Sequence, residues 1–238
     1  MNQVKRAIIM AAGKGTRLKK LTETVPKPLV SVRGTTFIEN IINVLHQNGI
    51  YEIYIVTGYK QEQFQRLPIQ YPGITLIYNP YYETCNNISS LYVARDYLKD
   101  VVILDGDQWI SNSAILTPTF KKSGYVATWQ KEESKECILE VMNDEVISCK
   151  RNGGKSGWRL WSVSFWTKHD GTLLKSFVEE DFRRKSNQQL YWDDIALFLH
   201  PNEFKLGIRP VSDDDLTEID SVDDLISFAP EYAVFYTK

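Results

Sequence analysis

Continuous apolar runs alternate with helical periodicity along the first half of the chain. Apolar runs predict buried strands over residues 5–11, 52–57, 74–79 and 101–104. Apolar residues at helical spacing predict helices after Thr36 and over residues 88–98. Glu39 follows Thr36 by three residues, which predicts a capping box, and Gly49 is suited to end that helix. Because strands alternate with helices, we expect parallel βαβ units with right-handed crossovers.

The second half has shorter apolar segments separated by turn residues. Strands are predicted over residues 126–131, 138–142, 146–149, 159–166 and 204–210. Turn residues at 143–144 and 152–154 join some of these segments and indicate an antiparallel extension. Helices are predicted over residues 172–184, 193–199 and 221–228. The expected fold is therefore an α/β three-layer sandwich with a mixed, mostly parallel sheet and a small antiparallel extension.

Composition and charge narrow the class of protein. The 238 residues contain no repeat or linker, which favours one domain over residues 1–238. A net charge of -2 gives no basic surface for nucleic acid, and no apolar run reaches the ~20 residues that membrane insertion needs. The three cysteines lack CxxC spacing, so we expect reduced thiols and a cytoplasmic location, without disulfides or zinc.

A glycine loop follows the first predicted strand, with the sequence AAGKGTR over residues 11–17 and PKPL over residues 26–29. Glycines at this position let backbone N–H groups approach a phosphate, and Arg17 and Lys27 add positive charge for a triphosphate. The alternative is a plain turn with solvated charges. The loop lacks the GK[ST] ending of a Walker A motif and the third glycine of a dinucleotide fingerprint.

Carboxylates stand at two further places. Asp105 and Asp107 end the strand predicted over residues 101–104, at the sheet edge where α/β proteins bind ligands. Asp220 lies just before the last predicted helix. Such oxygen ligands suit Mg²⁺, whereas an Asx turn for Asp105 and Asp107 and a helix N-cap for Asp220 are the structural alternatives.

The glycine loop together with TETVPKPL closely resembles the signature of the sugar-phosphate nucleotidyltransferase superfamily. The resemblance implies that Asp107 and Asp220 hold the catalytic Mg²⁺, and that these acids act with Arg17 and Lys27 in catalysis. It also implies a nucleotide site made by Ala11, Ala12, Gly13, Gly15, Thr16, Arg17, Lys27 and Asp105. This chain departs from the family at Lys20, where proline is common.

The segments CNNISSLY, VSFW, LYWD and EIDSV are similar to bacterial CTP:phosphocholine cytidylyltransferases of the LicC type, along nearly the whole chain. This resemblance implies CTP as the donor, recognition of its base by Asn87 and Ser90, and use of the product in cell-surface decoration. A nucleotide-binding half over about residues 1–110 and an acceptor-binding half over about residues 111–238 are then expected.

The acceptor site is expected at Tyr191, Trp192, Asp193, Glu218 and Lys155. Aromatic faces bind a quaternary ammonium and carboxylates add negative charge, while Lys155 would grip the acceptor phosphate. Packing at a helix start and a solvated loop lysine are the structural alternatives for Tyr191-Trp192 and Lys155.

Phosphocholine is thus the first expected acceptor. However, Cys137 stands where the phosphocholine group tends to have tryptophan. The same reaction on 2-aminoethylphosphonate or phosphoethanolamine, a sugar-1-phosphate nucleotidyltransferase and a non-catalytic nucleotide-sensing subunit remain alternatives. A phosphate dianion needs no general base, so His46, His169 and His200 are expected to be solvent-facing or capping residues. The sequence does not predict the oligomeric state.

Overall fold

A computed structural model describes residues 1–236, so positions 237 and 238 of the expected domain lie outside the described residues. Four parallel strands form the centre of the sheet. In spatial order they are β7 (Val101–Asp105), β2 (Arg6–Ala11), β5 (Glu52–Thr57) and β6 (Ile74–Tyr78). All four match strands predicted from apolar runs, and their carboxyl ends lie at one edge, as expected for parallel strands.

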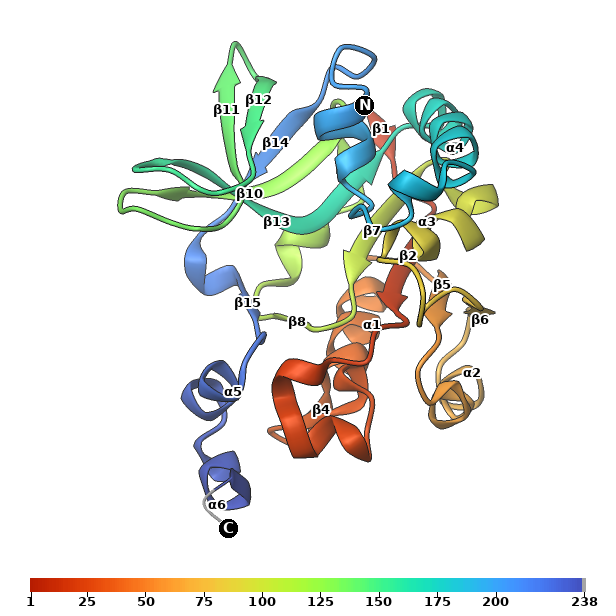
Figure 1. The fold of residues 1–238 in the computed structure, drawn as a ribbon, viewed down its shortest axis with the longest axis vertical. Coiled ribbons are helices and arrows are strands. Elements are labelled where there is room, and N and C mark those ends of the chain that lie inside the picture. Colours follow the sequence, from red (N-terminus) through yellow and green to blue (C-terminus); the bar gives the residue numbers. More distant parts are fainter. Residues whose placement is uncertain (237–238) are drawn as a thin grey trace.

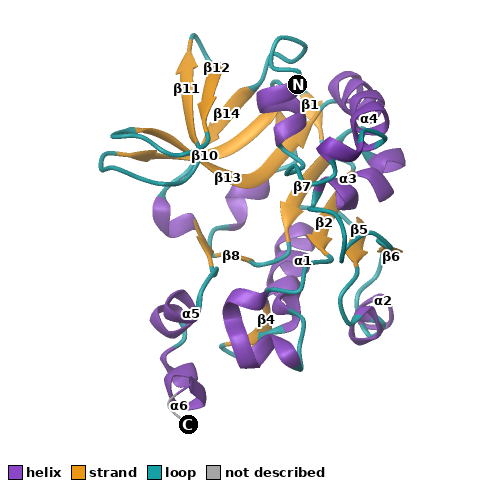
Figure 2. Cartoon of the chain, in the orientation of Figure 1, coloured by secondary structure: helices purple, strands orange, loops and turns teal. Residues whose placement is uncertain are grey.

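The sheet continues beyond β7 as a mixed extension. Its strands are β13 (Gly157–Trp166), β10 (Gly124–Gln130), β14 (Gly207–Pro210), β11 (Ile138–Met142) and β12 (Glu145–Lys150). β13 runs antiparallel to β7, β10 and β11, whereas β14 runs parallel to β10. Asn143 and Asp144 both have positive φ, as a tight hairpin turn between β11 and β12 requires. Figure 2 shows these strands extending away from the main helices.

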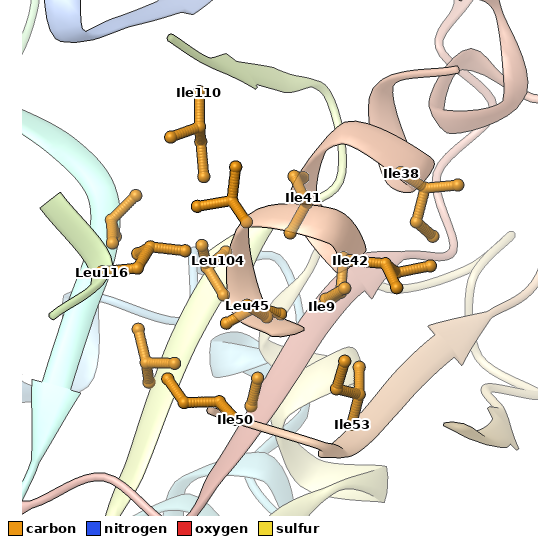
Figure 3. Packing of buried hydrophobic residues seen from close by; sticks show 14 of the residues in the cluster. Ile9, Ile38, Ile41, Ile42, Leu45, Ile50, Ile53, Leu104, Ile110 and Leu116 are labelled. Carbon is orange, nitrogen blue, oxygen red and sulfur yellow. The ribbon is translucent and has the colours of Figure 1, made fainter. Parts of the chain in front are cut away.

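Helices cover both faces of the central sheet. The helices that cover it are α1 (Phe37–Gln47), α3 (Ile88–Val93) and α4 (Lys168–Phe182). Because side chains alternate along a strand, Ile9 packs with α1 on one face (Figure 3), and Ile8 packs with α3 and α4 on the other. The predicted α/β three-layer architecture with a mixed sheet is confirmed.

The remaining elements are short. The strands and α-helices among them are β1 (Asn2–Gln3), β3 (Ser31–Val32), β4 (Thr35–Thr36), β8 (Gln108–Ile110), β9 (Thr119–Phe120), β15 (Leu216–Glu218), α2 (Leu67–Gln70), α5 (Val222–Phe228) and α6 (Ala233–Tyr236). The helix predicted over residues 193–199 is a short π-helix, Ile195–Leu199. None of the helices within residues 1–236 is both long and apolar enough to cross a membrane. The antiparallel pair β8–β15 was not predicted, and it is important for the site.

Local signals at α1 are confirmed, and others need correction. Thr36 accepts a hydrogen bond from the Glu39 amide while Glu39 accepts one from the Thr36 amide, which completes the predicted capping box. The helix predicted over residues 88–98 ends at Val93, followed by a separate 3-10 turn at Arg95–Tyr97. The glycine loop continues into a 3-10 segment, Thr16–Glu23, which is interrupted at Lys19 by a positive φ.

His169 is exposed, as expected, whereas His46 and His200 are partly buried and make ring contacts. The His200 ring pairs with buried Asp181 at 2.7 Å and stacks on Phe177. His46 stacks on Tyr51 with ring centroids 4.7 Å apart.

A separate apolar cluster joins the C-terminal segment to the loop after β2. Leu225 of α5 packs in it with Leu18, Leu21 and Phe37. The Tyr236 hydroxyl also donates a hydrogen bond to the Leu18 carbonyl at 2.7 Å. The last helices therefore lie against the segment that follows the glycine loop, at the lower end of the molecule in Figure 1.

Candidate active site

One pocket of about 640 Å³ lies at the carboxyl ends of the central strands. Its walls come from the glycine loop, the start of α3, the ends of β7 and β15, the middle of β13, the residues directly before β11 and after β12, and the segment 191–193. The lining residues are Met10, Ala11, Ala12, Gly13, Gly15, Thr16, Arg17, Lys27, Pro28, Asn87, Ser90, Asp105, Asp107, Lys135, Glu136, Cys137, Arg151, Leu160, Ser162, Tyr191, Trp192, Asp193, Glu218 and Asp220. The structure thus brings together every predicted site residue except Lys155.

The glycine loop passes close to Lys27. Gly15 has φ +61°, a left-handed conformation that favours glycine, and a Cβ on it would lie 2.7 Å from the Lys27 Cβ. The short 3-10 helix Lys27–Leu29 then directs the buried Lys27 side chain into the pocket.

Lys27 joins the two predicted metal-binding acids. Its Nζ lies 2.6 Å from Asp107 Oδ2 and 3.0 Å from Asp220 Oδ1, and Arg17 donates to Asp220 Oδ1 at 2.7 Å. Burial opposes the charged form, but Asp107 and Asp220 outweigh it and raise the pKa of Lys27. Lys27 is therefore an ammonium ion at neutral pH.

The β8–β15 pair explains how acids so distant in sequence meet. Gln108 pairs with Glu218, so Asp107, directly before β8, lies beside the end of β15. Asp220 follows two residues later and is not the helix N-cap, because Ser221 caps α5. The N-cap interpretation of Asp220 is therefore wrong, and its carboxylate is available to the pocket.

Acidic side chains outnumber basic ones in this pocket. Six carboxylates line it against four cationic side chains. Burial, together with Asp107 and Asp220, raises the pKa of Glu218 to about 8. Burial, together with Asp107, Glu218 and Asp193, raises the pKa of Asp105 well above its ordinary value. Raised pKa values of this kind show that the acids crowd one another, and a cation bound among them would favour their charged forms and offset the charge of a triphosphate.

The residues present fit a divalent metal ion. Asp107 Oδ1 is buried and has no hydrogen-bond partner among the described residues. Hard oxygen ligands of this kind suit Mg²⁺, which usually completes its shell with water and phosphate oxygens. No group of three or more His, Cys, Asp or Glu residues suited to a metal occurs within residues 1–236, so the protein would supply few of the ligands.

At the end of the pocket where the acceptor is expected, the two aromatic residues differ in exposure. Tyr191 is 52% exposed, whereas Trp192 is 1% exposed and stacks on Tyr125 with ring centroids 6.0 Å apart. Asp193 lies beside them, and burial and then the charge of Asp194 raise its pKa to about 6. This end therefore offers one open aromatic face and a carboxylate.

Several pocket residues were missed by the sequence reasoning. Arg151 lines the pocket and forms an ion pair with buried Asp194, which also accepts a hydrogen bond from the Tyr191 amide at 2.9 Å. Lys135 and Glu136 line it from the loop before β11. In contrast, Lys155 is exposed and does not line the pocket. No local pattern marked Arg151, because its position depends on how the hairpin folds over segment 191–194.

Known proteins resemble this chain in sequence and in fold. A family profile described as "Nucleotidyl transferase" matches residues 6–136. The 2-aminoethylphosphonate cytidylyltransferase of Lancefieldella rimae is 36% identical over 228 residues, which cover 95% of this chain and 92% of that protein. The choline-phosphate cytidylyltransferase of Streptococcus pneumoniae is 32% identical over 219 residues, covering 92% of this chain and 94% of that protein.

A solved structure of the CTP:phosphocholine cytidylyltransferase from Streptococcus pneumoniae (LicC) has a TM-score of 0.89 to this chain. The sequence identity in that comparison is 31%, and the match covers 96% of this chain and 99% of the other. The similarity therefore extends past the family profile into the half of the chain that contains Tyr191, Asp193 and Asp220.

Proposed function

This chain belongs to the nucleotidyl transferase family, and we propose that it transfers CMP from CTP to a short phosphorylated or phosphonylated amine, with release of pyrophosphate. One observation supports this function above the others. Arg17, Lys27, Asp107 and Asp220 form one hydrogen-bonded cluster beside the glycine loop. A nucleotide-sensing subunit without activity would not need all four groups in contact.

The chain's own groups suit the handling of a triphosphate. The backbone of residues 11–16 lines the pocket, where glycines leave N–H groups accessible to phosphate oxygens. The Arg17 guanidinium and the Lys27 ammonium would stabilise the negative charge that develops on the leaving pyrophosphate. Catalysis would then consist mainly of positioning and charge neutralisation.

Asp107 and Asp220 are the groups that would hold a divalent ion, which we propose to be Mg²⁺. When bound, Mg²⁺ supplies Lewis-acid stabilisation of phosphate charge. Lys27 pairs with both carboxylates and so holds them close together. The acceptor's phosphate or phosphonate oxygen would attack the α-phosphorus of CTP, and no histidine lines the pocket to act as a base.

For the acceptor, the geometry favours a primary ammonium such as that of 2-aminoethylphosphonate. A primary ammonium donates hydrogen bonds and needs carboxylate acceptors, such as Asp193. A quaternary ammonium needs several aromatic faces, but Trp192 lines the pocket with only 1% of its surface exposed, and Cys137 contributes no ring. Phosphocholine, the acceptor ranked first from the sequence, is therefore the second candidate, supported by the open face of Tyr191.

We also propose that residues up to about 110 bind mainly the nucleotide and that later residues bind mainly the acceptor. Asp220 is the exception, because it joins the nucleotide end from the C-terminal segment. Dependence on CTP suits the cytoplasmic location expected from the sequence. Use of the product in surface decoration is a further expectation from the resemblance.

The decisive experiment measures pyrophosphate release with CTP and Mg²⁺ and four separate acceptors. These are 2-aminoethylphosphonate, phosphoethanolamine, phosphocholine and glucose 1-phosphate. Turnover with a primary amine ahead of phosphocholine is the expected result. Preference for phosphocholine would overturn the choice of amine, preference for the sugar phosphate would overturn the acceptor class, and failure with every acceptor would contradict the proposed reaction.

A variant sharpens the comparison between the two amines. Cys137→Trp adds an aromatic wall, so we expect it to raise kcat/KM for phosphocholine relative to 2-aminoethylphosphonate by about tenfold. Cys137→Ser is the matched control, because it changes the same thiol without adding a ring. An equal shift in both variants would show that the wall at residue 137 does not select the amine.

A further inference from the structure

Asn79 is a buried residue that fixes the direction of several hydrogen bonds. It directly follows β6, is 1% exposed and does not line the pocket. Its Oδ1 accepts a hydrogen bond from the Tyr81 backbone amide at 2.9 Å. Because that amide is only a donor, the Asn79 oxygen is identified, and its Nδ2 must face Ser89 and Ser90. The Nδ2 donates to Ser89 Oγ at 2.9 Å and to Ser90 Oγ at 3.1 Å.

The two serines use their own hydrogens differently. Ser89 donates its hydroxyl hydrogen to the Asn86 carbonyl at 2.7 Å and does not line the pocket. Ser90 is 3% exposed, lines the pocket and accepts from Asn79, but none of the described residues accepts its hydrogen. Because its oxygen already accepts from Asn79, the Ser90 hydroxyl is left to donate its hydrogen to a ligand in the pocket.

Asn87 also presents a hydrogen-bond donor to the pocket, and its orientation is fixed by the backbone of Trp192. Its Oδ1 accepts a hydrogen bond from the Trp192 backbone amide at 2.9 Å, which again identifies the oxygen. The Asn87 side chain makes no capping bond at the start of α3, although it stands at the N-cap position. Its Nδ2 has no acceptor among the described residues, and Asn87 lines the pocket one helical turn from Ser90. The pocket wall thus presents two neighbouring donors.

Two neighbouring donors distinguish the pyrimidine bases. On the Watson–Crick edge, N3 and O2 of cytosine are both acceptors, whereas uracil has an N–H donor at N3. A donor placed against that N–H is left without a partner, and such mismatches discriminate strongly in buried sites. We propose that Asn79, as a positioning residue, makes the pocket selective for CTP over UTP by holding Ser90 as a donor beside Asn87. This inference rests on the proposed function, in which the pocket binds a nucleoside triphosphate.

The first test measures the ratio of CTP to UTP affinity, by calorimetric titration of each nucleotide with Mg²⁺. We expect the wild type to prefer CTP by about a hundredfold or more. Ser90→Ala should lower the ratio about tenfold, because it removes one donor. Ser89→Ala is the matched control, since Ser89 makes the same contact to Asn79 without facing the pocket, and it should leave the ratio unchanged.

The second test reverses the direction of the hydrogen bond between residue 79 and Ser90. Asn79→Asp keeps the acceptor for the Tyr81 amide but offers no donor, so the Ser90 hydrogen would turn toward residue 79 and its lone pairs toward the pocket. We expect UTP binding to improve while CTP binding weakens, which loss of packing alone would not produce. If this variant fails to fold, the Ser90→Ala and Ser89→Ala pair still tests the proposal.

The outcomes separate this inference from the proposed function. Tight binding of both nucleotides by the wild type, or an equal ratio in Ser90→Ala and Ser89→Ala, would overturn the base selectivity and leave the transferase reaction intact. Failure to bind either nucleotide would contradict the proposed function itself.

Discussion

At the scale of single residues, Asp107 and Asp220 have the most direct part in the proposed chemistry. Both lie against the Lys27 ammonium, and Asp107 keeps a buried oxygen without a partner among the described residues. We expect Asp107→Ala and Asp220→Ala each to lower kcat at least about a thousandfold, equivalent to ~4 kcal/mol, because a metal ligand is lost. Pyrophosphate release under saturating CTP and acceptor measures the effect.

Asp223→Ala provides the control for these variants, because Asp223 is exposed on α5, three residues from Asp220. Its turnover should remain near that of the wild type, and thermal unfolding of all three variants should show an intact fold. Near-normal rates in either of the other two variants would contradict the metal assignment.

We expect Asp193 to give the proposed reaction a specific pH dependence. Its pKa is raised to about 6 by burial and by Asp194, so the carboxylate is charged at pH 7.5 and takes up a proton as the pH falls through about 6. A protonated Asp193 cannot pair with an ammonium. We therefore expect KM for the amine acceptor to rise severalfold between pH 7.5 and 5, with a smaller change in KM for CTP.

Several charged or titratable groups act on Asp193, and a variant isolates its contribution. They are Asp105 of β7, Tyr125 of β10, Cys137 and Cys149 of the β11–β12 hairpin, Arg151 and Asp194. The acceptor phosphate also takes up a proton near pH ~6. Asp193→Asn keeps those titrations and removes only its own, so its KM should be high and nearly flat with pH. A profile as steep as that of the wild type would assign the effect to another group.

At the scale of elements, the sequence predicted best what local physics determines. Apolar runs identified the central strands, and Thr36 with Glu39 identified the start of α1. The three-residue strands β8 and β15 are too short for alternation to be visible, so their pairing, which places Asp107 beside Glu218, could not be predicted. The choice of Lys155 was wrong because the sequence does not show which residue after β12 faces the pocket. In the structure that residue is Arg151.

The glycine loop provides a prediction at this scale. Gly15 has a positive φ, and a Cβ there would lie 2.7 Å from the Lys27 Cβ, so Gly15→Ala strains the backbone and displaces Lys27. We expect a stability loss of about 1–3 kcal/mol and a fall in kcat/KM of about a hundredfold. Denaturant unfolding and pyrophosphate release measure the two effects.

Gly13→Ala is the matched variant in the same loop. A Cβ on Gly13 meets nothing within 4 Å, so the unfolding free energy should stay within ~0.5 kcal/mol of the wild type. Its KM for CTP should still rise if phosphates approach this backbone. Equal stability losses in the two variants would show that the loop conformation, rather than the Lys27 contact, limits substitution.

At the scale of the whole molecule, the site is assembled from segments that are far apart in the chain. Arg17 and Lys27 lie in the segment between β2 and α1, and Asp220 lies in the segment before α5. The apolar cluster with Leu18, Leu21, Phe37 and Leu225 holds these segments together. This contact could not be predicted from either segment alone, because the apolar side chains of each segment are buried by the other. Packing remote from the reacting atoms therefore sets the geometry of the charged cluster.

Two leucine variants test this connection. Leu225 and Leu45 are both fully buried, but Leu225 packs in the cluster beside the site, and Leu45 packs between α1 and the sheet. Each leucine-to-alanine change should lower stability by about 2–5 kcal/mol. Only Leu225→Ala should also lower kcat/KM for CTP, by about ten- to a hundredfold at a temperature where both variants are folded, because it loosens Asp220 against Arg17 and Lys27. If Leu45→Ala lost as much activity at equal stability, the effect would follow general destabilisation. If Leu225→Ala kept its activity, the charged cluster would be rigid without the C-terminal helix, and α5 would serve the stability of the fold alone.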